Sequence, residues 1–196
     1  MLISDKKRFL FVHIQKTGGT SLTRHLKSQI PDLQLYFKAH TIYAYAETKY
    51  NIFYKAAFVR NPFDRLVSWY FAMDRSRKNP PNRLQTEAMK RANTFEEFIY
   101  NCGDVSFKEG WRPFSNNQFD YLLDREGNMS MDFIGRFESI GEDSKILCQH
   151  LGLKDIEIPH INSSSHKDYR YYYNDATRKI IAKKFEKDLD YFKYSF

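Results

Sequence analysis

Residues 9–21 read FLFVHIQKTGGTS, an apolar run that stops at a polar loop with two glycines. A helical pattern follows from Thr20 to about Gln29, so the stretch predicts a strand, a loop and a helix in succession. The loop carries one lysine, two hydroxyl side chains after the glycines and no acidic residue. Backbone N–H groups in such a loop, with the following helix N-terminus, attract an anion, most often a phosphate. The alternative is a glycine turn that only connects the strand to the helix.

The rest of the chain alternates between predicted strands and predicted helices. Further strands are expected at residues 33–39, 52–59 and 131–137. Further helices are expected at 64–75, 84–92, 95–101, 140–151 and 174–190, with 41–50 as a candidate short helix. This alternation predicts an α/β fold in which a central parallel sheet is covered on both faces, giving three layers. The length fits one domain and there is no repeat or low-complexity linker, so we expect a single domain over residues 1–196.

Ligands of parallel α/β sheets bind beyond the carboxyl ends of the strands. The loops that follow the first three predicted strands therefore share one crevice. Those loops hold Lys16–Ser21, His40 and Arg60.

Arg60 provides a second candidate anion-binding group. It opens the segment RNPFDRLVS, residues 60–68, and an arginine at a strand end can hold a phosphate bidentately. Ser68 lies two turns into the following helix, on a face that can return to the same anion. The alternative is that Arg60 or Arg65 pairs with Asp64 or another nearby carboxylate.

The composition limits the class of protein. The formal net charge is +7 at pH 7, which indicates either a solvated basic surface or a partner carrying phosphate, sulfate or carboxylate. The two cysteines, Cys102 and Cys148, lack the spacing of metal ligands and are expected to be buried free thiols. The N-terminus lacks the apolar core of a signal peptide, and no run is long enough for a membrane-spanning helix. We therefore expect a cytoplasmic protein with no integral membrane segment; the oligomeric state is left open.

The glycine-rich loop differs from that of nucleotide triphosphatases. In their motif the lysine follows the glycines, whereas here Lys16 precedes Gly18 and Gly19. The chain also lacks a convincing acidic strand end for Mg²⁺, which enzymes that move a γ-phosphoryl group need. We expect the loop to hold one phosphate-like group without a metal ion, with Lys16 at its leaving oxygen. A nucleotide-kinase-like phosphotransferase is the alternative; a nucleic-acid-binding module fits the charge but not a sheet crevice with a phosphate loop, so no nucleic acid partner is expected.

Residues 13–21, HIQKTGGTS, resemble the 5′-phosphosulfate loop of carbohydrate sulfotransferases, the group with heparan sulfate 6-O- and chondroitin 4-O-sulfotransferases. Residues 59–68, VRNPFDRLVS, resemble the 3′-phosphate-binding segment of the same family. Shorter resemblances at 132–138, 162–166 and 188–194 follow in the family's order, so nearly the whole chain is covered. The resemblance implies the α/β fold of that family with a P-loop-like phosphosulfate loop, and we expect a bacterial member.

The resemblance also implies a co-substrate and the residues that hold it. The donor would be 3′-phosphoadenosine 5′-phosphosulfate (PAPS), from which a sulfuryl group passes in line to an acceptor hydroxyl. Lys16 would neutralise charge on the leaving 5′-phosphate, and Arg60 with Ser68 would hold the 3′-phosphate. The remaining 5′-phosphate-binding residues implied are Thr17, Gly18, Gly19, Thr20 and Ser21. Ser164 and Lys167, in the loop 162–167, would close over the nucleotide.

The acceptor side is assigned to His40, Trp111 and Arg112. Histidine is the natural general base near neutral pH, and the resemblance places His40 in that role at the end of the second predicted strand. The alternatives are a His40 that only bonds to the backbone and a mechanism that depends more on Lys16; His13 is expected to point into the structure. Trp111 and Arg112 resemble a segment near the acceptor cleft and would bind a carbohydrate, either a polysaccharide or a glycolipid. The alternative is a core position for Trp111 and a surface charge for Arg112.

Overall fold

The computed structural model describes residues 1–36, 40, 42–76, 90–105, 114–154 and 167–196. The chain divides into two compact units. The first comprises Met1–Arg60 and Gln118–Ile161, and the second comprises Asn61–Asn117 and Asn162–Phe196. The single domain expected from the sequence stays a prediction.

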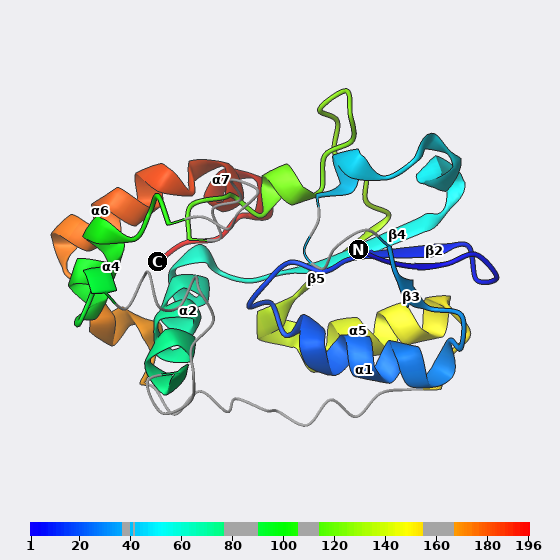
Figure 1. Ribbon diagram of the computed structural model, residues 1–196, viewed down its shortest axis with the longest axis horizontal. Helices are drawn as coiled ribbons and strands as arrows, with labels where there is room; N and C mark the ends of the chain where they lie inside the picture. The colour runs from blue at the N-terminus through cyan, green and yellow to red at the C-terminus, as the bar shows by residue number, and fades with distance from the viewer. Residues whose placement is uncertain (37–39, 41, 77–89, 106–113, 155–166) are drawn as a thin grey trace. The chain divides into compact units, whose positions relative to one another are not determined.

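The first unit is built on a five-stranded sheet with the strand order β3-β1-β2-β4-β5 (Figure 1). Its strands are β1 (Leu2–Ser4), β2 (Phe9–Val12), β3 (Gln34–Leu35), β4 (Tyr54–Val59) and β5 (Phe133–Arg136). β2, β4 and β5 are parallel, while β1 is antiparallel to both β2 and β3. It follows that β3 runs in the same direction as β2. The predicted α/β fold with a central parallel sheet is confirmed.

Strand β1 is an element that the sequence did not predict. Its three residues lead into the charged turn at residues 5–8, where Arg8 has a φ of 48°. Ser4 donates from Oγ to Asp32 Oδ1 at 2.8 Å, and the Lys6 N–H donates to the other carboxylate oxygen at 3.0 Å. Three residues are too few for a recognisable period, and this strand depends on hydrogen bonds to a distant aspartate.

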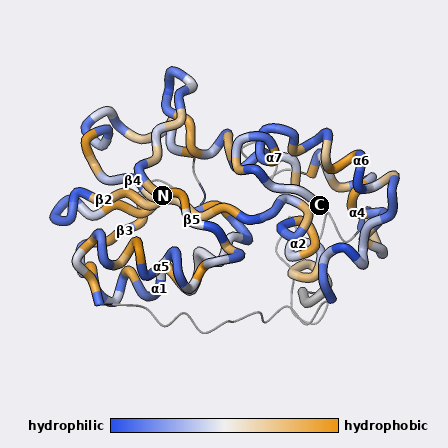
Figure 2. Tube along the Cα trace, turned by 180° about the vertical axis from the view of Figure 1, so that it is seen from behind, coloured by the Kyte–Doolittle hydropathy of each residue, from blue (hydrophilic) through white to orange (hydrophobic). Residues whose placement is uncertain are grey.

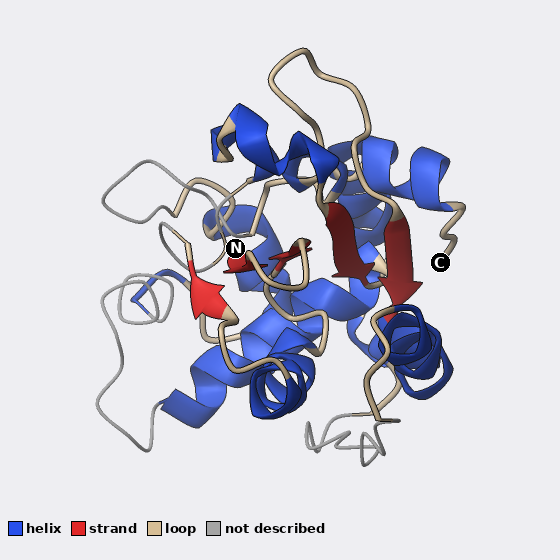
Figure 3. Ribbon diagram, turned by 90° about the vertical axis from the view of Figure 1, so that its right-hand side faces the viewer, coloured by secondary structure: helices blue, strands red, loops and turns tan. Residues whose placement is uncertain are grey.

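Two helices cover one face of this sheet. They are α1 (Gly19–Gln29) and α5 (Ile140–His150) (Figures 1 and 3). Their buried side chains form one hydrophobic cluster with the strands; it includes Leu22, Leu26, Leu147, Cys148, Phe9, Phe11 and Phe58. Helix α1 ends at Ile30, whose extended backbone is the conformation that a following proline enforces.

The opposite face of the sheet is buried as well. Leu10, Val12 and Ala57 are on that face, and none of them is exposed. Strands β2 and β4 are therefore coloured mainly as hydrophobic in Figure 2, without the alternation of a half-exposed sheet. The candidate helix at 41–50 is replaced by the 3-10 helices η1 (Tyr43–Tyr45) and η2 (Thr48–Ile52), which bury Tyr43 and Tyr50. Two further 3-10 helices, η3 (Phe119–Tyr121) and η4 (Phe137–Ser139), lie in the same unit.

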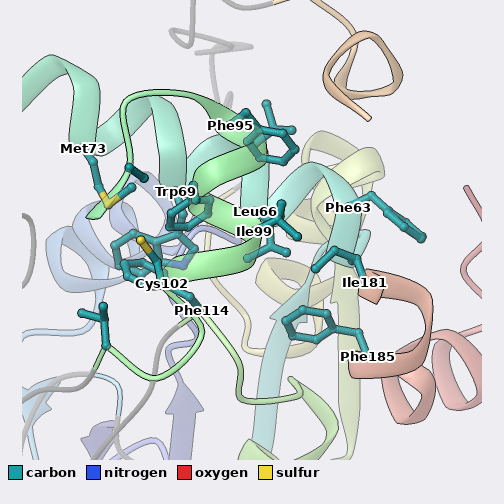
Figure 4. Close-up of a cluster of buried hydrophobic side chains, with 14 residues drawn as sticks. Phe63, Leu66, Trp69, Met73, Phe95, Ile99, Cys102, Phe114, Ile181 and Phe185 are labelled. Carbon is teal, nitrogen blue, oxygen red and sulfur yellow. The ribbon is translucent and has the colours of Figure 1, made fainter. Parts of the chain in front are cut away.

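The second unit is helical in the part that the structure describes. Its elements are α2 (Pro62–Ser76), α4 (Phe95–Asn101), η5 (Tyr169–Tyr172), α6 (Asp175–Lys184) and α7 (Glu186–Phe192). Figure 4 shows its buried cluster, to which α2, α4 and α6 contribute apolar and aromatic side chains. The cluster includes Phe63, Leu66, Trp69, Phe95, Phe98, Phe114, Ile181 and Phe185.

The predicted helices of this unit are found with adjusted ends. α4 starts at the expected cap, where Thr94 and Glu97 form a reciprocal capping box. The helix expected at 174–190 is interrupted at the fully buried Phe185, and the one expected at 84–92 lies mostly outside the described residues. In the described ranges, no helix has the length and apolar character needed to span a membrane.

Candidate active site

The loop between β2 and α1 adopts a conformation that suits an anion. Lys16 and Gly18 have φ values of 68° and 78°, so the chain turns twice through the left-handed region. Thr17 is buried, and its Oγ1 donates to the carbonyl of Ile14 at 2.9 Å, which closes the turn from within. α1 then begins at Gly19 with no acidic residue in its first turn, so the N–H groups of that turn are not matched by a negative side chain.

Packing explains why both loop glycines are glycine. A Cβ atom on Gly18 would collide with the Ile140 side chain and lie 3.1 Å from Phe137 Cδ2. A Cβ atom on Gly19 would collide with the ring of His13. The turn therefore packs against three side chains and is more than a connection between strand and helix.

His40 was expected directly after a strand at 33–39; that strand, β3, ends at Leu35, and His40 lies five residues further on, next to the end of β2. Because β3 runs parallel to β2, its carboxyl end faces the same edge of the sheet as the phosphate loop. His40 Nδ1 is 2.9 Å from the carbonyl oxygen of His13, and a carbonyl can only accept, so Nδ1 carries the hydrogen. In the neutral ring, Nε2 is then the basic atom. The backbone bond that was the alternative to catalysis is present, and it leaves that nitrogen as an acceptor.

His13 is a member of this site that the sequence did not assign. It follows the last residue of β2, and its partly buried ring meets the His40 ring edge-on with 4.6 Å between centroids. Burial lowers the pKa of His13 to about 3, with smaller contributions from the charges of His40 and the Met1 amino group. The ring of His13 is therefore neutral at physiological pH and is a poor base.

Arg60 is tied to the phosphate loop through its guanidinium group. Nη1 donates to the carbonyl of Lys16 at 3.1 Å, and the guanidinium carbon lies 3.9 Å from the centroid of the Phe137 ring. Gln118 fixes its backbone: Oε1 accepts from the Arg60 N–H at 2.9 Å, and Nε2 donates to the Arg60 carbonyl at 2.7 Å. These contacts bring Lys16 and Arg60 together, as the strand-end argument predicted.

Three supporting residues were given no role in the site from the sequence, although His13 and Phe137 lie within segments that resemble the family. His13 and Phe137 continue strand-like runs, and Gln118 follows an irregular segment. Gln118 and Arg60 are 58 positions apart, so nothing local relates one to the other. Their importance comes from contacts between residues that are distant in the sequence. A single sequence does not reveal such contacts.

The other predicted site residues are on the second unit or outside the described residues. Ser68 is buried on α2. The N–H of Lys167 donates to the Tyr172 hydroxyl at 3.0 Å, and its Nζ lies 5.4 Å from the centroid of the Tyr171 ring. Ser164, Trp111 and Arg112 lie outside the described residues. The roles given to all five stay predictions.

Two hydroxyl side chains that follow the loop glycines are accessible, and the described residues offer no cluster of metal ligands. Thr20 is exposed and Ser21 partly exposed in the first turn of α1, where an anion can reach them. Among the described residues, no group of three histidine, cysteine, aspartate or glutamate side chains could hold a metal ion.

A family model described as the sulfotransferase family matches residues 1–195. The chain belongs to the sulfotransferase family. This confirms the resemblance seen in the two anion-binding motifs, and the match extends over both units. The expected bacterial origin stays a prediction.

Two individual sulfotransferases are similar to this chain. Carbohydrate sulfotransferase 9 from Homo sapiens is 28% identical over 164 residues, which cover 72% of this chain and 34% of that protein. The chain thus spans about a third of the length of this curated relative. A sulfotransferase from Alicyclobacillus acidocaldarius, known as a crystal structure, aligns with a TM-score of 0.44 at 16% identity, covering 93% of this chain and 92% of that one.

Proposed function

We propose that this protein transfers a sulfuryl group from PAPS to a hydroxyl group of a carbohydrate acceptor. The observation that carries the proposal is the direct link between two anion-binding residues, the bond from Arg60 Nη1 to the Lys16 carbonyl. A donor with phosphates at both its 3′ and 5′ positions requires two such groups. Membership of the sulfotransferase family supports the same reaction.

The residues of the loop fit the phosphosulfate end of that donor. The two left-handed residues and the helix start at Gly19 form a cradle without a carboxylate, and the lysine adds a positive charge beside it. In nucleotide triphosphatases the lysine follows the glycines of the loop, whereas here Lys16 precedes Gly18 and Gly19, which favours a phosphosulfate over a γ-phosphoryl donor. Arg60 and, from the sequence, Ser68 are assigned to the 3′-phosphate.

Each candidate catalytic residue has one task in this proposal. When bound, PAPS supplies the sulfuryl group. The bond between the sulfur of that group and an oxygen of the 5′-phosphate breaks as the acceptor oxygen bonds to sulfur. His40 Nε2 accepts the proton of the acceptor hydroxyl, because Nδ1 carries a hydrogen that it donates to the His13 carbonyl. Lys16 stabilises the charge that develops on the leaving phosphate oxygen.

The acceptor class is inferred from a relative and from the sequence. One similar human protein is named a carbohydrate sulfotransferase, and the sequence assigns Trp111 and Arg112 to a sugar-binding role. We propose a polysaccharide or a glycolipid as acceptor and the cytoplasm as location. Turnover of PAPS with a panel of such acceptors, followed by identification of the sulfated product, tests the acceptor class.

The donor is tested by calorimetry with 3′,5′-ADP, 5′-AMP and ATP. We expect 3′,5′-ADP to bind at least tenfold more tightly than 5′-AMP, and Arg60→Ala to remove most of that preference. Arg24→Ala, which removes an exposed arginine from α1 of the same unit, is the matched control and should keep it. Equal affinities for 3′,5′-ADP and 5′-AMP would contradict the proposal, and tight ATP binding that depends on Mg²⁺ would favour the nucleotide-kinase alternative.

A further inference from the structure

His13 contacts both segments that carry the candidate catalytic residues. Its carbonyl oxygen accepts from Nδ1 of His40, and its ring packs against the ring of the same residue. On its other side the ring lies against Gly19, the first residue of α1. The ring of Phe11 also lies near the imidazole, with 6.0 Å between the two ring centroids. The imidazole is thus held between β2, the start of α1 and His40.

His40 needs such support because its own backbone is strained. Its φ of 63° is in the left-handed region, which is unfavourable for a non-glycine residue. Surrounding contacts must therefore determine the orientation of the residue. One hydrogen bond and one ring contact of the His40 side chain go to His13.

We infer that His13 is a positioning residue, which holds His40 as the Nδ1-protonated tautomer and thereby keeps Nε2 as the proton acceptor. The hydrogen bond selects the tautomer, and the ring of His13 fixes the plane of the His40 ring. The consequence for turnover rests on the proposed function, while the tautomer of His40 is a property of the protein alone.

The chemistry of His13 suits this role better than a cationic residue would. Burial is the main cause that lowers the pKa of its ring, and the charges of His40 and the Met1 amino group add to it. All three favour the neutral ring. A positive charge 4.6 Å from His40 would oppose proton uptake by His40, and a neutral neighbour does not.

The direct test is nuclear magnetic resonance of the histidine side chains in ¹⁵N-labelled protein. Two-bond correlations between ring nitrogens and ring protons identify which nitrogen of His40 carries the hydrogen. We expect the Nδ1–H tautomer in the unmodified protein. We expect a shift toward Nε2–H in His13→Ala, where the ring contact is lost, and retention of Nδ1–H in His13→Phe, which fills the same space.

Kinetics then separate positioning from binding. His13→Ala should lower kcat by about 10- to 100-fold and change 3′,5′-ADP affinity less than twofold, with His13→Phe recovering most of the rate. The control is His150→Phe, which keeps an aromatic ring stacked on Tyr54 and should leave both quantities unchanged.

Each outcome has a definite meaning. An Nε2–H tautomer of His40 in the unmodified protein, or the same tautomer in all three proteins, overturns the inference. Loss of Nδ1–H in His13→Phe as well as in His13→Ala overturns it as written, because the ring nitrogens and not the packing would then be responsible. If the protein shows no sulfuryl transfer at all, the proposed function fails and the tautomer result still decides the role of His13.

Discussion

Two of the residues with unusual backbone conformations are the two assigned to catalysis. Lys16 and His40 both have positive φ values, as do Arg8 and Lys193 among the described non-glycine residues. Arg8 lies in a hairpin turn and Lys193 ends α7, where such conformations are common. Lys16 and His40 have no such explanation, and both are held by bonds to distant residues, Arg60 and His13. Strain maintained in this way is typical of functional sites.

The lowered pKa of His13 predicts how the stability of the protein depends on pH. The pKa of His13 is lowered to about 3, so between pH 6.5 and 3 the unfolded chain binds a proton here that the folded protein does not. Above pH 6.5 the neutral ring makes its full contribution to the free energy of unfolding. This contribution is lost as the pH falls through this window. From pH 7 to pH 5, the free energy of unfolding should fall by ~2 kcal/mol more in the unmodified protein than in His13→Phe. Urea unfolding at the two pH values measures this, and parallel behaviour of the two proteins would contradict the lowered pKa.

The sequence predicted individual site residues where one local pattern contained them. Arg60 directly follows an apolar run, Lys16 and Gly18 lie in the polar loop after another, and the edge at which they meet follows from parallel strands. Gln118 and Phe137 could not be found in this way, because their importance comes from contacts to Arg60 that join separate parts of the chain.

At the scale of elements, the glycine turn before α1 predicts a contrast between two substitutions. Gly18 and Gly127 have similar φ values, 78° and 85°, so alanine at either position costs about 1–2 kcal/mol in backbone strain. Only at Gly18 would the new methyl group also collide with Ile140, adding about 1–3 kcal/mol. Gly127→Ala should therefore leave 3′,5′-ADP affinity unchanged, whereas Gly18→Ala should unfold at lower urea and bind at least tenfold more weakly. Equal affinities in the two variants would show that the turn does not hold the ligand.

Elements were predicted best where one face is continuously apolar. β2, β4, α1, α4 and α5 were each found within two residues of the expected position. β1 was missed because its stability comes from its neighbours β2 and β3. The break in the last helix was missed because Phe185 leaves the helical path to be fully buried in the cluster, which is a requirement of packing and not of local propensity.

At the scale of the whole molecule, each compact unit contains one buried cysteine. Cys148 is in the cluster of the first unit and Cys102 in that of the second; both are free thiols with no exposed surface, as predicted. Reaction of each thiol with an alkylating reagent therefore reports the opening of its own unit. The phosphate loop and Arg60 belong to the first unit, so 3′,5′-ADP should slow the modification of Cys148.

The same measurement tests the assignment of Ser68. If Ser68, a residue of the second unit, binds the 3′-phosphate, 3′,5′-ADP should slow modification of Cys102 as well. Mass spectrometry of the modified peptides resolves the two sites, and 5′-AMP serves as the control ligand. Protection confined to Cys148 would remove Ser68 from the proposed site.

The bond between Arg60 and the Lys16 carbonyl has a thermodynamic consequence for recognition of the donor. In the proposed function one guanidinium group supports the turn at one phosphate and binds the other, so we expect that the two ends of the ligand are not recognised independently. We expect the free energies of the two interactions to be coupled, so that a nucleotide lacking the 3′-phosphate also loses affinity at its 5′ end. Selectivity for the correct donor would then exceed the contribution of the 3′-phosphate contacts alone.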